Sequence, residues 1–246
     1  MSYYQYRPSY GFFGNIPPVV KNIIIINIIM LILSKLTNKF MYEHFALFYP
    51  ASPLFNPYQF LTHMFMHGNI GHLFFNMYAF WLFGSTLERI WGGKKFFLYY
   101  LITGIGAAVF YMFVLWIQVI QAEAAIDPNV LMRMKSLVGE GQVLVNSMPT
   151  IQRWNDFMFT PMVGASGAVF GILLAYGMLF PNNVLQLIFP PVALKAKWFV
   201  IIYGVLELVL GFTATSSNIA HFAHVGGMIF GYILVVHWKR KGRLYL

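Results

Sequence analysis

The sequence predicts an all-α polytopic membrane protein, built as a six-transmembrane-helix bundle with a membrane-interfacial first loop. Of 246 residues, 59% are hydrophobic and only 9% are charged, whereas a soluble domain carries about 25% charged residues. Six apolar stretches approach the length of about 20 residues that a helix needs to cross the hydrocarbon of a bilayer. The lipid bilayer is therefore the expected surrounding, and the length predicts a single domain over 1–246 with its core at about 16–239.

The six predicted spans follow one another with mostly short turns between them. A Gly92-Gly93 pair breaks the chain after the second span, and a Pro190-Pro191 pair breaks it before the fifth. The fifth stretch is short and the second is long, so the ends are placed to within several residues. The spans are 16–34, 60–87, 96–119, 161–179, 198–212 and 219–236.

Two connections between the spans are long. The first, 36–58, is rich in aromatic residues and contains Pro50, Pro53 and Pro57, a combination that a spanning helix would not tolerate. We expect it to lie as a structured segment in the membrane interface. The second, 121–160, is polar, and the apolar spacing over 122–137 predicts an amphipathic helix.

The distribution of basic residues predicts the orientation in the membrane. An even number of spans puts both termini on one side, and that side carries eleven of the 16 Lys and Arg residues. Because basic residues are enriched on the cytoplasmic side, both termini are expected in the cytoplasm. The six-span layout favours a bacterial plasma (inner) membrane, with an organelle membrane as the alternative. The eleven are Arg7, Lys21, Arg89, Lys94, Lys95, Lys195, Lys197, Lys239, Arg240, Lys241 and Arg243, and the other five are Lys35, Lys39, Arg133, Lys135 and Arg153.

Several classes of function fit this sequence poorly. The formal charge of +9 comes in short clusters between apolar runs, which is typical of topology signals rather than of nucleic-acid binding. The absence of cysteine excludes disulfide and thiol chemistry. The first apolar run is long enough to span, so no cleavable signal peptide is expected, and no internal repeat supports an inverted-repeat transporter.

Polar residues inside membrane spans are costly and mark function by default, and Ser166 in the fourth span is the first of them. It lies near the start of the span between Gly164 and Gly167, and glycines let another helix or a substrate backbone come close. The unpaired N–H groups at a helix N-terminus suit a developing oxyanion. The alternative is a patch of small residues that only packs helices together.

His224 in the sixth span stands three residues before Gly227, and Gly227 and Gly231 form a GxxxG face. Such a face predicts close approach to another helix, and the spacing places His224 on nearly the same side. If the approached helix is the fourth span, His224 can take the proton of the Ser166 hydroxyl. The alternative for a lone membrane histidine is an interhelical hydrogen bond.

The second span carries His72 and Asn76, four residues apart and so on one helical face. Both side chains can donate hydrogen bonds to an oxyanion. His63 and His67 precede them and are expected to tie the interfacial loop down through hydrogen bonds. A metal site is the alternative, because histidines four residues apart make a good ligand pair, and His221 and His224 in the sixth span add another pair. No carboxylate adjoins these histidines in sequence, so no metal and no cofactor are expected.

Glu207 in the fifth span is the acidic residue that falls inside a predicted span. A third member of a triad would orient the base and stabilise its cation. Nothing in the sequence fixes the direction of this side chain, so it is expected to be neutral or hydrogen-bonded to a neighbouring helix. The sequence therefore predicts a Ser–His dyad with no assigned acid.

Taken together, these residues resemble the rhomboid intramembrane serine proteases. The resemblance rests on three motifs, which fall in the spans and in the order that the six-helix form of that family uses. It covers about 16–239. The motifs are His67-x4-His72-x3-Asn76, Gly164-Ala165-Ser166-Gly167 and Ala223-His224-x2-Gly227-x3-Gly231.

The resemblance implies a role for each of these residues. Ser166 would attack the scissile carbonyl, with His224 as general base and then general acid. His72, Asn76 and the backbone N–H of Ser166 would form the oxyanion hole, and Phe170 would lie against the catalytic imidazole. The resemblance also implies a fourth span that starts below the outer surface, a membrane-embedded first loop, and a mobile fifth span.

The resemblance further implies that the partners are transmembrane protein substrates whose spanning segments have helix-weakening residues near the outer face. The sequence defines neither the natural substrate nor an oligomeric state. Two departures concern the loops: 36–58 lacks the Trp-Arg pair of many relatives, and 121–160 is longer than in the smallest members. No added cytosolic domain or seventh span is expected. The alternatives are a catalytically inactive relative that binds membrane clients and a histidine-rich membrane transporter.

Overall fold

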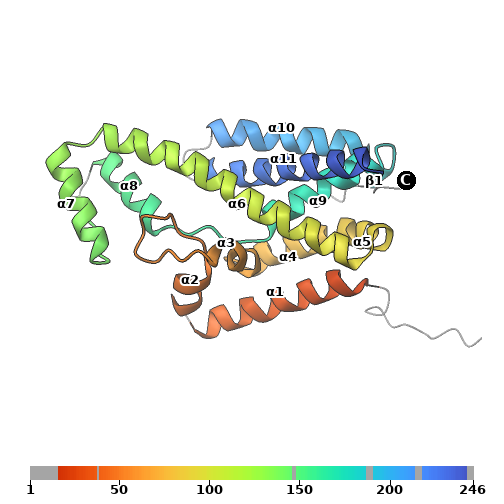
Figure 1. Cartoon of the computed structure of the whole chain (residues 1–246), viewed down its shortest axis with the longest axis horizontal. Coiled ribbons are helices and arrows are strands. Elements are labelled where there is room, and N and C mark those ends of the chain that lie inside the picture. Colours follow the sequence, from red (N-terminus) through yellow and green to blue (C-terminus); the bar gives the residue numbers. More distant parts are fainter. Residues whose placement is uncertain (1–15, 38, 146–147, 187–190, 214–217, 243–246) are drawn as a thin grey trace, which may run out of the picture.

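The computed structural model describes residues 16–37, 39–145, 148–186, 191–213 and 218–242. Its helices lie side by side in an elongated bundle (Figure 1). Within the described part, four helices are long and apolar enough to cross a membrane. They are α1 (Pro18–Leu36), α6 (Gly93–Ala124), α10 (Ala196–Thr213) and α11 (Asn218–Arg240).

The second predicted span begins at the wrong residue. The chain forms short turns up to Met66, and a helical run begins at Ile70 and continues through a π-helical turn to Trp91. Asn69 causes this boundary, because its side-chain oxygen accepts the backbone N–H of His72 at 2.8 Å and so caps the helix. The elements are α3 (Gln59–Thr62), η2 (His63–Phe65), α4 (Ile70–Ala79), η3 (Phe80–Gly84) and α5 (Ser85–Trp91).

The fourth predicted span is shorter than expected. α9 (Ser166–Leu179) has 14 residues, so it is about 21 Å long and does not by itself reach across a hydrocarbon core of about 30 Å. It packs against α4, α6, α10 and α11, and most of its residues are buried. The segment before it enters the interior of the bundle, where α9 begins (Figure 1).

The first long connection is folded rather than extended. It contains α2 (Lys39–Phe45), and an isolated bridge joins Leu47 to Met162 just before α9. Gln59 holds the loop, because its side-chain amide donates to the carbonyl oxygens of residues 43, 44 and 54 at 3.4, 3.2 and 2.8 Å. The loop is therefore fixed against the segment that leads to Ser166.

The polar connection contains two helices, α7 (Pro128–Gly139) and α8 (Pro149–Phe159), and α6 continues to Ala124 before it. The predicted helix over 122–137 is thus split by the turn at Ile126–Asp127, and Asp127 caps α7. A short antiparallel pair, β1 (Val184–Gln186) with β2 (Ala193–Lys195), precedes α10 and was not predicted. Pro190 of the predicted break lies outside the described residues.

The basic residues fall into two groups, one at each end of the bundle. The start of α1 and the end of α11 lie at the same end, together with the end of α5 and the starts of α6 and α10 (Figure 1). Nine of the eleven basic residues assigned to one side lie on these element ends or directly next to them, whereas Arg7 and Arg243 lie outside the described residues. The remaining five lie on α1's last turn, α2, α7 and α8, toward the opposite end.

The start of α1 is held by a buried carboxylate from a distant element. Pro17 and Pro18 have no N–H, so Val19 and Val20 offer the first free donors of the helix. The two oxygens of Glu88 on α5 accept them, at 2.9 Å from Val19 N and 2.8 Å from Val20 N. This contact joins α1 to the rest of the bundle.

α9 and α11 touch through their backbones. A Cβ added to Gly227 would overlap the carbonyl oxygen of Gly167, and one added to Gly231 would stand 3.2 Å from the Cα of Gly171. Glycine at these positions therefore allows the two helices to approach to backbone contact. The GxxxG spacing of α11 predicted close approach to another helix, and the structure identifies that helix as α9.

Replacing Glu88 by Gln should lower the stability of the folded chain. The amide keeps one acceptor oxygen but presents an NH2 group to one of the two backbone donors, and losing a hydrogen bond to a buried charged group costs about 1–3 kcal/mol. Thermal unfolding of the detergent-solubilised protein measures the change. Unaltered unfolding would show that Glu88 does not fix α1.

Replacing Gly227 by Ala should destabilise the α9–α11 contact by about 1–3 kcal/mol, because the new methyl group has no space against Gly167. Gly139→Ala is the matched control, since a Cβ there meets nothing within 4 Å. Thermal unfolding of both variants tests the difference. Equal stability of the two variants would contradict a backbone-limited contact.

Candidate active site

Ser166 and His224 face each other across the α9–α11 contact. Ser166 is the first residue of α9, and its Oγ lies 2.9 Å from Nε2 of His224. Both side chains are partly exposed, whereas Gly167 and Ala168 behind the serine are buried. A hydroxyl at this distance can pass its proton to an imidazole nitrogen that carries a lone pair.

The imidazole of His224 is fixed on one face by Phe170. The two rings are stacked, with centroids 4.2 Å apart and an interplanar angle of 7°. Phe170 stands one turn after Ser166 on α9, so the same helix supplies the hydroxyl and the ring that sets the plane of the imidazole.

The sequence assigned no acid to His224, but a carboxylate lies beside its imidazole, and Glu207 bonds a neighbouring helix as expected. Oε2 of Glu207 lies 2.8 Å from Nδ1 of His224 and 2.7 Å from Nδ1 of His221. The missed signal is a stripe on α10: Gly204, Glu207 and Gly211 recur at helical spacing, and Gly204 and Gly211 meet side chains of α11. That stripe of small residues turns Glu207 toward α11.

His72 lies beside the loop that leads to the serine. A Cβ at Gly164, whose φ is +120°, would come within 2.9 Å of His72 Nε2, so only glycine fits there. The Nδ1 atom of His72 accepts a long hydrogen bond of 3.5 Å from Gly68 N, which leaves Nε2 as the protonated nitrogen on the side of Gly164. Asn76 is buried one turn later, and its Nδ2 donates to the carbonyl of His72 at 2.9 Å.

His63 and His67 do not tie the loop through their rings. Nδ1 of His63 bonds Gln59 O at 2.9 Å within its own helical segment, and both ring nitrogens of the buried His67 have no partner among the described residues. The backbone carbonyls make the ties instead, since Tyr42 donates to His67 O at 2.7 Å and Gly164 N donates to His63 O at 2.9 Å.

One group of described residues has the composition of a metal site. Ligand atoms of Glu207, His221 and His224 lie within 4.8 Å of one another, so the argument that no carboxylate adjoins the histidines does not hold in three dimensions. Donor atoms around a tetrahedral zinc ion stand about 3.4 Å apart. The separations of 2.7 and 2.8 Å are instead those of charge-assisted hydrogen bonds.

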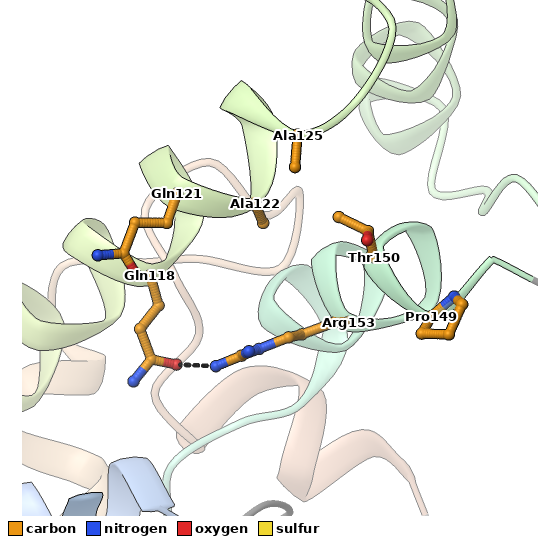
Figure 2. Close-up of a pocket in the computed structure, with 7 residues that line it drawn as sticks. All are labelled: Gln118, Gln121, Ala122, Ala125, Pro149, Thr150 and Arg153. Carbon is orange, nitrogen blue, oxygen red and sulfur yellow. Dashed lines mark hydrogen bonds between the residues drawn. The ribbon is translucent and has the colours of Figure 1, made fainter.

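A pocket of about 300 Å³ lies elsewhere, between the end of α6 and the start of α8. Figure 2 shows Arg153 pointing across it to Gln118, whose Oε1 accepts from Arg153 Nη2 at 3.0 Å. The lining residues are Gln118, Gln121, Ala122, Ala125, Pro149, Thr150 and Arg153. None of the predicted site residues belongs to it, so it does not enter the proposed chemistry.

Known proteins resemble this chain over most of its length. The Rhomboid domain matches residues 55–240. RHOMBOID-like protein 12, mitochondrial, of Arabidopsis thaliana is 30% identical over 74% of this chain and 46% of its own length. Rhomboid protease AarA of Providencia stuartii is 26% identical over 74% of this chain and 58% of its own length, and Rhomboid protease GluP of Bacillus subtilis is 26% identical over 70% and 24%.

The chain spans about half the length of the first two relatives. The relatives include mitochondrial as well as bacterial proteins, so the expectation of a bacterial plasma membrane has no support from them. The apolar helices identify an integral membrane protein. Because the domain match covers more than half of the chain and includes Ser166 and His224, the chain belongs to the rhomboid family.

Proposed function

We propose that this protein is an intramembrane serine endopeptidase that cleaves transmembrane segments of other membrane proteins. The observation that carries the proposal is the 2.9 Å separation of Ser166 Oγ and His224 Nε2 at the start of α9. The family includes proteins named as proteases, and its members act on transmembrane substrates within the membrane. The activity of this chain rests on the geometry of its own residues.

In the proposed reaction, Ser166 Oγ attacks the scissile carbonyl while its proton moves to Nε2 of His224. The acyl-enzyme forms as the histidine returns that proton to the leaving amine, and water then hydrolyses the ester by the same route in reverse. Serine alone is a poor nucleophile at neutral pH, so the adjacent imidazole is required.

The proposed oxyanion hole is formed by three donors around the start of α9. The backbone N–H of Ser166 is at the first turn, where helical N–H groups lack intrahelical partners. His72 Nε2 stands against Gly164, and the Asn76 side chain lies one turn further along α4. Donors fixed in place before the reaction stabilise the oxyanion without having to reorganise.

The proposed topology has six spans with both termini on one side of the membrane. Four helices are long enough to span the membrane. The helical run from Ile70 to Trp91 (α4 to α5) and the short helix α9 supply the other two spans. The basic residues at the end where α1 begins support a cytoplasmic location of that end. The start of α9, where Ser166 stands, then faces the opposite side, on which α7 and α8 lie (Figure 1).

Ser166→Ala and His224→Ala should each abolish cleavage of a model transmembrane substrate by the purified protein in detergent or proteoliposomes. A serine-reactive fluorophosphonate should label the unaltered protein and neither variant, because only an activated serine reacts. Cleavage that survives Ser166→Ala would falsify the proposal. A folded protein that neither cleaves nor labels would identify an inactive relative, and histidine-dependent ion flux without labelling would identify a transporter.

Asn76→Ala should lower kcat by about 100-fold to 1,000-fold with a small change in KM, because an oxyanion donor acts in the transition state. Asn27→Ala is the matched control. The Asn27 side chain is buried and donates to Ile23 O at 2.8 Å, four residues earlier, as Asn76 does to His72, but it lies on α1. This control should lower stability and leave kcat within about twofold, whereas equal kcat losses in both variants would exclude an oxyanion role for Asn76.

A further inference from the structure

The carboxylate of Glu207 lies between two imidazoles. A single oxygen, Oε2, is 2.8 Å from Nδ1 of His224 and 2.7 Å from Nδ1 of His221. Glu207 belongs to α10 and both histidines belong to α11, so the contact joins two helices. Glu207 is buried, and a carboxylate inside a membrane protein is costly unless it is paired.

These two hydrogen bonds determine which nitrogen of each histidine carries a proton. A carboxylate can only accept, so both Nδ1 atoms must be N–H donors. A neutral imidazole protonated at Nδ1 has its lone pair at Nε2. In His224 that lone pair faces Ser166 Oγ at 2.9 Å, as a general base requires.

Two contacts fix the orientation of the His224 imidazole. Phe170 stacks on its face at 4.2 Å and fixes the ring plane. The bond from Nδ1 to Glu207 fixes the rotation of the ring within that plane, so that Nε2 points at the hydroxyl. The second bond, from His221, directs the same oxygen and prevents the carboxylate from turning away.

We propose that Glu207 is a positioning residue for the Ser166–His224 pair, and that His221 holds the Glu207 carboxylate in place. This inference rests on the proposed function. During attack, the Ser166 Oγ–H bond breaks and the proton binds Nε2 of His224, while the proton on Nδ1 remains there. Glu207 stays ionised and stabilises the imidazolium that forms.

Two substitutions separate the contributions of hydrogen bonding and charge. Glu207→Gln keeps an acceptor for Nδ1 but removes the charge, and Glu207→Leu removes both at similar volume. We expect kcat to fall about 10-fold or more in Glu207→Gln and about 100-fold or more in Glu207→Leu, with small changes in KM. Glu207→Asp should recover part of the Leu loss, because it restores a carboxylate on a shorter side chain.

His221 is tested by rescue. His221→Leu should lower kcat less than Glu207→Leu does, because the bond from Glu207 to His224 remains possible. His221→Asn should restore activity toward that of the unaltered protein, because its side-chain amide can donate to Oε2 in place of Nδ1. Equal activity of His221→Leu and His221→Asn would show that His221 does not hold the Glu207 carboxylate in place.

The tautomer provides a measurement that does not depend on catalysis. In the ¹⁵N spectrum of histidine-labelled protein, assigned with His224→Ala, His224 should be the Nδ1–H tautomer, and Glu207→Leu should shift it toward Nε2–H. Glu88→Gln is the matched control, because Glu88 is also buried and accepts two hydrogen bonds. It should lower stability without changing the His224 spectrum or the kcat of the folded protein.

The outcomes distinguish this inference from the proposed function. If Ser166→Ala abolishes cleavage and Glu207→Leu cleaves at the full rate with an unchanged His224 spectrum, Glu207 has no positioning role. If Ser166→Ala still cleaves, the proposed function fails whatever Glu207 does, and the tautomer measurement still stands. If chelation with EDTA abolishes activity and zinc restores it only when Glu207 is present, the cluster binds a metal and the positioning role is overturned.

Discussion

The backbone contact between α9 and α11 is the constraint on which the proposed site depends. Ser166 directly precedes Gly167, and His224 lies one turn before Gly227, so each functional side chain adjoins the point where the two helices touch. A hydroxyl and an imidazole have short reach. They meet at 2.9 Å because no side chain separates the helices that carry them. Tyr99 on α6 reinforces this contact, since its hydroxyl donates to Gly171 O at 2.8 Å.

Two buried carboxylates serve different purposes although each accepts two hydrogen bonds. The donors of Glu88 are backbone N–H groups, which keep their protons, so this contact is purely structural. The donors of Glu207 are imidazoles, which have a second nitrogen whose state depends on the first. The same acceptor chemistry therefore caps a helix in one place and is proposed to set the state of a base in the other.

The spacing of residues in the sequence correctly predicted which side chains share one face of α11, because side chains three or four residues apart on a helix lie on the same side. Gly227, Gly231 and His224 were placed correctly on one face of α11 for this reason. The break before α4 was missed, because Gly68 and Asn69 form a cap inside a stretch whose average hydropathy is high. The direction of Glu207 was missed because one acid in an apolar helix has no periodic partner of its own kind, and only the small residues Gly204 and Gly211 mark its face.

α10 presents most of its surface outward, and its buried residues are confined to Ala196, Val200, Glu207 and Gly211. Near Gly211, moving α10 away from α11 would remove van der Waals contacts. The start of α10 is held instead by hydrogen bonds from Ala196 N to Asn183 O at 2.8 Å and from Lys197 N to Pro181 O at 3.2 Å. At Glu207 the same movement would leave a carboxylate without donors in apolar surroundings, at a cost of several kcal/mol. The resistance of this helix to displacement is therefore uneven along its length. Small thermal motions should therefore displace the last turn of α10 more than the turn that contains the carboxylate.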